Sequence, residues 1–188
     1  VSASRKWKVH QIDIKTAFLH GKADMDIFMK QPPGFEDGSN LVCKLRKTLY
    51  GLKQAPRAWY FVLKGVLTNL GFEQVSADSS FWIHKANDVV VFLTTIVDDM
   101  LVVSPNEAYT LHIMDEILKK LPGTHGGRAK HYNGLRITWL DNTKEVVITQ
   151  AAHVEKLYEK FSRFMSPSVQ RSLPGPAGLR VCKSGSNL

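Results

Sequence analysis

The chain has 188 residues, a net charge of +8 and a pI near 9.5, and 44% of its residues are hydrophobic. This composition can build a core and excludes a wholly disordered chain. The excess positive charge favours an anionic partner, most commonly nucleic acid, although a basic surface without a partner explains the charge equally well. Cys43 and Cys182 form no CxxC pair, so neither a disulfide framework nor a thiolate zinc site is expected. No apolar run approaches the roughly 20 residues of a membrane span, so no membrane partner is expected.

The first half of the chain predicts short strands and one strong helix. Residues 9–18 alternate apolar and polar side chains as a strand does, and residues 26–45 predict two short strands around a Pro-Pro-Gly loop. A helix follows, with Pro56 in its first turn and Gly71 at its C-terminal end. Its apolar stripe, with spacings of three and four, consists of Trp59, Val62, Leu63, Val66, Leu67 and Leu70.

The second half predicts two hairpins and two helices. The hairpins cover residues 80–95 and 135–150, and residues 101–103 form a return strand after an aspartate pair. A capping box that starts at Ser104 predicts the next helix. A third helix is expected from about residue 151 to 164, with four inward apolar residues: Val154, Leu157, Tyr158 and Phe161. This order predicts an α+β fold, in which helices cover one face of an antiparallel sheet.

The strongest chemical signal is the pair Asp98 and Asp99, in IVDDM between two apolar runs. Aspartate is common in turns, so a turn without further function is the simpler explanation. Two adjacent carboxylates repel each other, however, and this raises the pKa of one of them unless a cation is bound. The pair is therefore a candidate metal site.

Asp13 supplies a third carboxylate if its strand neighbours the acidic pair. It lies between Ile12 and Ile14 and could face Asp98 across a sheet. Carboxylate oxygens without Cys or His partners suit Mg²⁺, and two such ions about 4 Å apart are a common device for phosphoryl transfer. Together with the basic charge, this set predicts a nucleotidyl transferase.

Three segments extend this interpretation: QIDIKTAFLHG with MKQPPGFEDG behind it, LVCKLRKTLYGLKQAPRAWY, and IVDDMLVV. Together they resemble the reverse transcriptase, an RNA-directed DNA polymerase, in the Pol polyprotein of copia-type LTR retrotransposons. The resemblance covers roughly residues 7–165, and KLRKTLYGLKQAPRAW is its most specific motif. It implies a polymerase palm with partial fingers over residues 1–150 and the start of a thumb or connection helix over 151–165. Residues 166–188 are rich in Ser, Pro and Gly, so a flexible tail is expected there.

The resemblance implies a two-metal centre in the palm. Asp13, Asp98 and Asp99 would be the catalytic carboxylates, and these three with the carbonyl of Ile14 would hold two Mg²⁺ ions, which Mn²⁺ could replace. The partners would be an RNA or DNA template with its primer, a dNTP and the remainder of the Pol polyprotein. The expected location is intracellular, in a cytoplasmic virus-like particle or the nucleus.

The resemblance also implies contacts with substrate. Phe18 would exclude a ribose 2′-hydroxyl, although an ordinary core aromatic is the simpler explanation. Lys53 or Arg57 would meet phosphate, although a solvated basic face explains each of them equally well. The nucleotide and template set as a whole is Phe18, Tyr50, Gly51, Lys53, Gln54 and Arg57, and the primer-proximal residues are Ile96 and Val97.

Two departures from the family pattern leave alternatives open. Ile96 stands where the family usually has tyrosine, and residues 123–128 replace an acidic turn. These changes, together with a start close to the first catalytic strand, predict that the isolated fragment is inactive or weak. One alternative is a degenerate, non-catalytic remnant of a retroelement that binds nucleic acid. Another is a different two-metal enzyme such as a nuclease or integrase, against which LYGLKQAPRAW argues.

Overall fold

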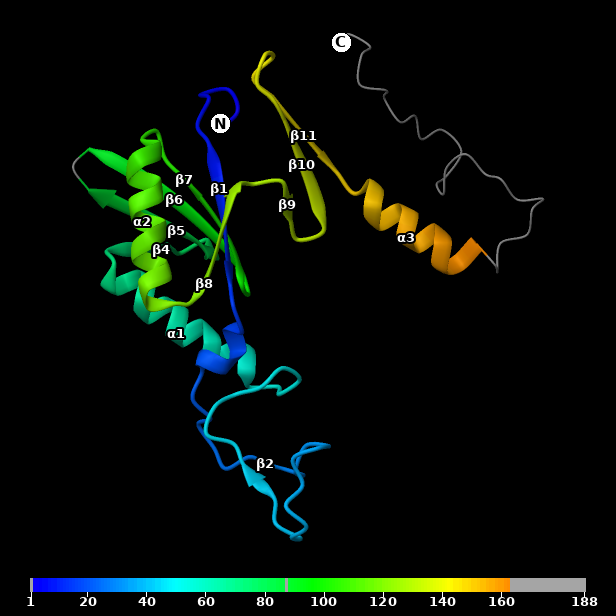
Figure 1. The fold of residues 1–188 in the computed structure, drawn as a ribbon. Helices are drawn as coiled ribbons and strands as arrows, with labels where there is room; N and C mark the ends of the chain where they lie inside the picture. Colours follow the sequence, from blue (N-terminus) through cyan, green and yellow to red (C-terminus); the bar gives the residue numbers. More distant parts are fainter. Residues whose placement is uncertain (1, 87, 163–188) are drawn as a thin grey trace. The chain divides into compact units, whose positions relative to one another are not determined.

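A computed structural model describes residues 2–86 and 88–162 (Figure 1). The predicted tail over 166–188 lies outside these residues. The chain divides into two compact units, of which the first is Val1–Gln150 and the second begins at Ala151. No helix in the described part is long and apolar enough to cross a membrane.

The main sheet of the first unit has six strands in the order β4-β5-β6-β7-β1-β8, and all its pairings are antiparallel. The predicted α+β class is therefore confirmed. The strand that carries Asp13 lies inside the sheet, between β7 and β8. The strands are β1 (Val9–Ile14), β4 (Phe72–Val75), β5 (Asp78–Ala86), β6 (Val89–Ile96), β7 (Asp99–Val103) and β8 (Gly123–Arg128).

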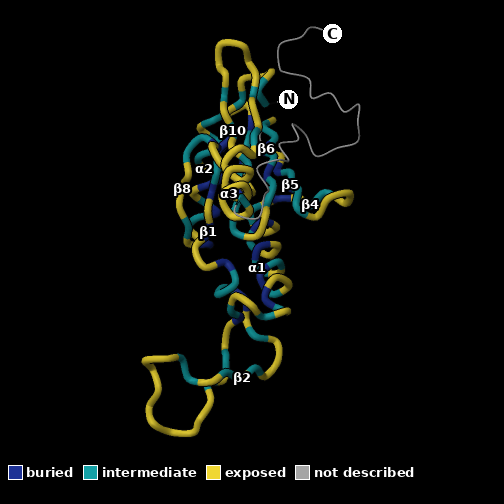
Figure 2. The backbone as a smooth tube through the Cα atoms, turned by 90° about the vertical axis from the view of Figure 1, so that its right-hand side faces the viewer, coloured by how far each residue is buried: buried dark blue, intermediate teal, exposed yellow. Residues whose placement is uncertain are grey.

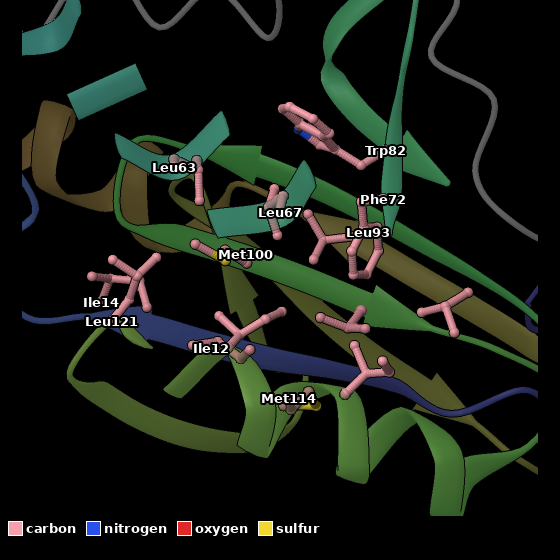
Figure 3. Close-up of a cluster of buried hydrophobic side chains, with 14 of the residues drawn as sticks. Ile12, Ile14, Leu63, Leu67, Phe72, Trp82, Leu93, Met100, Met114 and Leu121 are labelled. Carbon is pink, nitrogen blue, oxygen red and sulfur yellow. The ribbon is translucent and has the colours of Figure 1, made fainter. Parts of the chain in front are cut away.

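Two helices, α1 (Ala55–Asn69) and α2 (Glu107–Lys120), pack on one face of this sheet. Every second residue of the inner strands points to that face, as Ile12 and its partner Met100 show. Leu67 of α1 and Met114 of α2 meet them in one buried cluster (Figure 3). The predicted apolar stripe of α1 is thus confirmed as a core-facing stripe, because its members are buried or packed against this cluster.

Smaller elements complete the described chain. The short helix η1 (Ala17–His20) follows β1, and β2 (Phe28–Met29) pairs with β3 (Cys43–Lys44) in a segment, residues 22–47, that has no buried residue (Figure 2). The predicted second hairpin is present as β10 (Leu135–Leu140) and β11 (Glu145–Thr149), joined by β9 (His131–Tyr132) in a three-stranded sheet. The second unit contains α3 (Ala151–Phe161).

Residues 123–128, which stand where the family has an acidic turn, were not predicted as a strand, but they form β8 and pair with β1. Because this segment is rich in glycine, it lacks the alternation of apolar and polar residues that predicts a strand. Its pairing with β1 depends instead on backbone hydrogen bonds and on the close approach of the two strands. A Cβ atom at position 123 would lie 2.4 Å from the carbonyl oxygen of Asp13, so the strands reach this spacing only with glycine there. Strand β4 was also missed.

Two predictions about the helices were also wrong. The cap of α2 is Asn106, whose side chain accepts a hydrogen bond from the backbone N–H of Tyr109, whereas Ser104 bonds Thr110 instead. The apolar residues of α3 do not point into a core, because no residue of this helix is buried. Those expected inside are between 43% and 64% exposed: Val154, Leu157, Tyr158 and Phe161.

Candidate active site

The acidic pair lies at the turn between β6 and β7. Ile96 pairs with Asp99, so the turn itself consists of Val97 and Asp98. The prediction that both aspartates occupy the turn is corrected, since Asp99 is the first residue of β7. Val97 has a φ of 54°, in the left-handed region that a β-branched residue rarely adopts.

Asp13 lies on the strand next to this turn, as the sequence predicted. Its cross-strand partner is Asp99, however, and not Asp98. The backbone N–H of Ile14 donates to the carbonyl of Asp98 over 2.8 Å, which joins the end of β1 to the turn. The three carboxylates therefore come from two neighbouring strands and the turn, and Asp13 and Asp99 share one face of the sheet.

Gln11 also faces this group, two residues before Asp13, and was not predicted. Its side-chain amide donates to Oδ1 of Asp99 over 3.0 Å. Partial burial raises the pKa of Asp99; the Gln11 hydrogen bond opposes the increase, and the charges of Asp98 and Asp13 add to it. The site therefore concentrates negative charge. Within residues 2–86 and 88–162, no three His, Cys, Asp or Glu side chains are placed to hold a metal ion.

Trp59 of α1 contacts the turn from the helix side of the sheet. Its indole N–H donates to the carbonyl of Val97 over 2.7 Å, and only 3% of the residue is exposed. The sequence predicted a core residue here, and this is confirmed. The contact with the acidic turn was not predicted, because the stripe of α1 accounts for Trp59 without it.

The predicted nucleotide segment lies immediately before α1, and the structure brings part of it to η1. The rings of Phe18 and Tyr50 meet edge to face with 4.6 Å between their centroids. Phe18 packs against the core and Tyr50 is 56% exposed. Gly51 has a φ of 95° and open space around its Cα, and Gln54 precedes the first residue of α1.

The two basic residues of the predicted substrate set are exposed. Lys53 lies just before α1, and Arg57 lies within its first turn. Arg57 stacks on Phe61, with 5.7 Å from its guanidinium carbon to the ring centroid. It also lines an open cavity of about 420 Å³, whose other charged residues are Lys22 and Asp24. The primer-proximal residues Ile96 and Val97 are 38% and 43% exposed.

Comparison with known proteins agrees with this arrangement. The reverse transcriptase (RNA-dependent DNA polymerase) family matches over residues 1–170, so the chain belongs to that family. The chain is 31% identical over 178 residues to the retrovirus-related Pol polyprotein from transposon TNT 1-94 of Nicotiana tabacum. The matched region covers 93% of this chain and 13% of that protein.

Two Pol polyproteins of Arabidopsis thaliana are also similar. That from transposon RE1 is 44% identical over 114 residues, 60% of this chain and 8% of the relative. That from transposon RE2 is 36% identical over 122 residues, 64% of this chain and 8% of the relative. The predicted resemblance to retrotransposon reverse transcriptases is confirmed, and the chain spans 8–13% of the length of these three relatives.

Proposed function

We propose that this chain is the palm-centred part of an RNA-directed DNA polymerase of a copia-type retrotransposon. The observation that carries the proposal is the placement of Asp13 opposite Asp99, beside the turn that contains Asp98. In the reaction, the primer 3′-hydroxyl attacks the α-phosphorus of a dNTP. A new P–O bond forms, pyrophosphate leaves, and the hydroxyl proton is released.

The donor set suits Mg²⁺, because it consists of carboxylate oxygens that repel one another when no cation is present. Asp13 and Asp98 would hold the ions, with Asp99 and the carbonyl of Ile14 as further ligands. When bound, two Mg²⁺ ions stabilise the attacking and leaving oxygens. Gln11 holds Asp99 through its hydrogen bond, so Asp99 serves better as a neighbouring charge than as a principal ligand.

The segment before α1 would bind the incoming nucleotide and the template. Tyr50 and Gly51 offer an exposed ring and an open backbone, against which a base and sugar can lie. Lys53 and Arg57 are exposed cations that suit phosphate. Phe18, fixed against Tyr50, is the candidate for excluding a ribose 2′-hydroxyl.

The proposal makes metal binding the first measurement. We expect Mn²⁺ to bind the 188-residue chain, and Asp98→Asn to abolish this binding while the chain stays folded by circular dichroism. Asp88→Asn, at another hairpin turn, is the matched control and should bind Mn²⁺ as the wild type does. Equal binding by the wild type and Asp98→Asn would contradict a metal centre at this turn.

A second candidate function is nucleic-acid binding without chemistry, favoured by the +8 charge and by the absence of a preassembled metal cluster in the described residues. Such a protein would bind a primer–template duplex with strong salt dependence and no metal dependence. The polymerase proposal predicts in addition that a dNTP protects the chain from proteolysis only with Mg²⁺ and primer–template.

In the cell, the proposed setting is a cytoplasmic virus-like particle, with the remainder of a Pol polyprotein.

A further inference from the structure

We infer that Trp59 is a positioning residue, which holds the acidic turn in place against the first turns of α1. The inference rests on the proposed function, since the turn matters only if Asp98 and its neighbours act on substrate. Trp59 would not touch substrate or metal. It would act through the backbone of Val97, the residue that precedes Asp98.

The contact is short, and its donor is buried. The indole N–H of Trp59 and the carbonyl of Val97 are 2.7 Å apart, and Trp59 is only 3% exposed. Loss of this bond would leave a buried N–H donor without a partner, which is costly. The donor is a rigid ring on a helix whose other inward residues, Leu63 and Leu67, are buried in the core, so its position is fixed independently of the turn.

The turn needs such a tie because Val97 does not favour this conformation. Val97 has a φ of 54°, and a branched Cβ makes that region unfavourable. Its side chain is 43% exposed, so burial contributes little to keeping it there. The other ties include the strand pairing of Ile96 with Asp99 and the bond from Ile14 N–H to the Asp98 carbonyl.

Trp59 also connects the separate parts of the site. Its ring lies 5.8 Å, centroid to centroid, from His20 of η1, the element that carries Phe18. Its helix begins directly after the nucleotide segment, with Ala55 as the first residue. One side chain of α1 thus contacts both the acidic turn and η1.

The test compares Trp59→Phe with two control variants. Trp59→Phe keeps an aromatic ring in the core but loses the N–H donor. Trp82→Phe makes the same change at a buried tryptophan, 1% exposed, whose indole nitrogen has no hydrogen-bond partner among the described residues. Trp139→Phe removes an indole N–H bond of equal length, 2.7 Å, to the carbonyl of Ala129, away from the acidic turn. Circular dichroism establishes which variants are folded.

The first readout requires no metal. Hydrogen exchange of a peptide that spans residues 94–101 should be about three- to tenfold faster in Trp59→Phe, the range that loss of one intramolecular hydrogen bond implies. Both controls should exchange this peptide at the wild-type rate. A wild-type rate in a folded Trp59→Phe would overturn the inference, and so would equal acceleration in Trp82→Phe or Trp139→Phe.

The second readout separates this inference from the proposed function. Mn²⁺ affinity should fall about three- to tenfold in Trp59→Phe, because fewer molecules hold the turn in the binding conformation, and should not change in the controls. If the wild type and Asp98→Asn bind Mn²⁺ equally, the metal centre fails, whereas hydrogen exchange still decides whether Trp59 holds the turn. If binding depends on Asp98 and is the same in Trp59→Phe, the positioning role is overturned.

Discussion

Replacing Gly123 with alanine tests the packing that places Asp13. A Cβ atom at position 123 would lie 2.4 Å from the carbonyl oxygen of Asp13 and 3.2 Å from the Cα of Ile14. Both atoms belong to the backbone of β1, which is hydrogen-bonded on both sides and cannot yield as a flexible side chain would. The two strands must therefore separate.

The expected cost follows from the size of this overlap. Overpacking by a single carbon typically costs about 1–3 kcal/mol, and a contact with backbone belongs at the upper end of that range. For a chain of this size, 1 kcal/mol shifts the melting temperature by about 2–4 °C, so Gly123→Ala should melt at least ~4 °C below the wild type. Urea unfolding should show a lower midpoint with an unchanged slope.

Gly65→Ala is the matched control. Gly65 lies inside α1, and a Cβ atom there would meet no atom within 4 Å apart from its chain neighbours and the nearby backbone of its own helix. Alanine should stabilise the helix by about 0.5–1 kcal/mol, the usual difference between the two residues in a helix interior. The same substitution should thus lower the free energy of unfolding at position 123 and raise it at position 65. A wild-type or higher urea midpoint for Gly123→Ala would refute the close packing of β8 against β1.

Three other predictions concern pH, capping and burial. Asp99→Asn should raise the free energy of unfolding at pH 7 when no divalent cation is present. Folding raises the pKa of Asp99, so the wild type loses stability as the pH rises from about 3.8 through the folded-state pKa, and asparagine does not. Urea titrations at several pH values should show this gain vanish below about pH 3.8, and a gain that persists there would have another cause. Asn106→Ala should lower the free energy of unfolding by about 1 kcal/mol, because it removes the cap of α2. Thermal unfolding measures this loss, and an unchanged stability would indicate that Ser104 is the cap. Leu67→Ala should cost about 2–5 kcal/mol, whereas Leu157→Ala should change stability by less than ~0.5 kcal/mol; equal effects on urea unfolding would contradict the burial difference.

Local patterns in the sequence predicted much of the fold. The stripe that runs through Leu63 and Leu67 defined α1, because helix periodicity and a buried face coincide there. Pro56 and Gly71 marked its ends, since each has a specific backbone preference. The same kind of pattern did not predict β4 and β8, because these edge strands have short or glycine-rich sequences.

The candidate site was predicted less completely than the fold. The adjacent aspartates and Asp13 stand out as acidic residues beside apolar strands, and the family motifs supported them. The role of Gln11 could not be inferred, because its bond to Asp99 joins residues 88 positions apart in the chain. The apolar face of α3 predicted burial, but periodicity indicates only which face is apolar and not whether anything covers it.

The sequence by itself determined the α+β class, the helix α1 and the three carboxylates, because local periodicity and residue chemistry are written in neighbouring positions. Only the tertiary structure decided that Asp13 faces Asp99, that Gly123 lies against the backbone of β1, and that Trp59 bonds the acidic turn. These facts depend on strand register and on the docking of α1. Both are set by the simultaneous packing of segments distant in the chain, which no local pattern specifies.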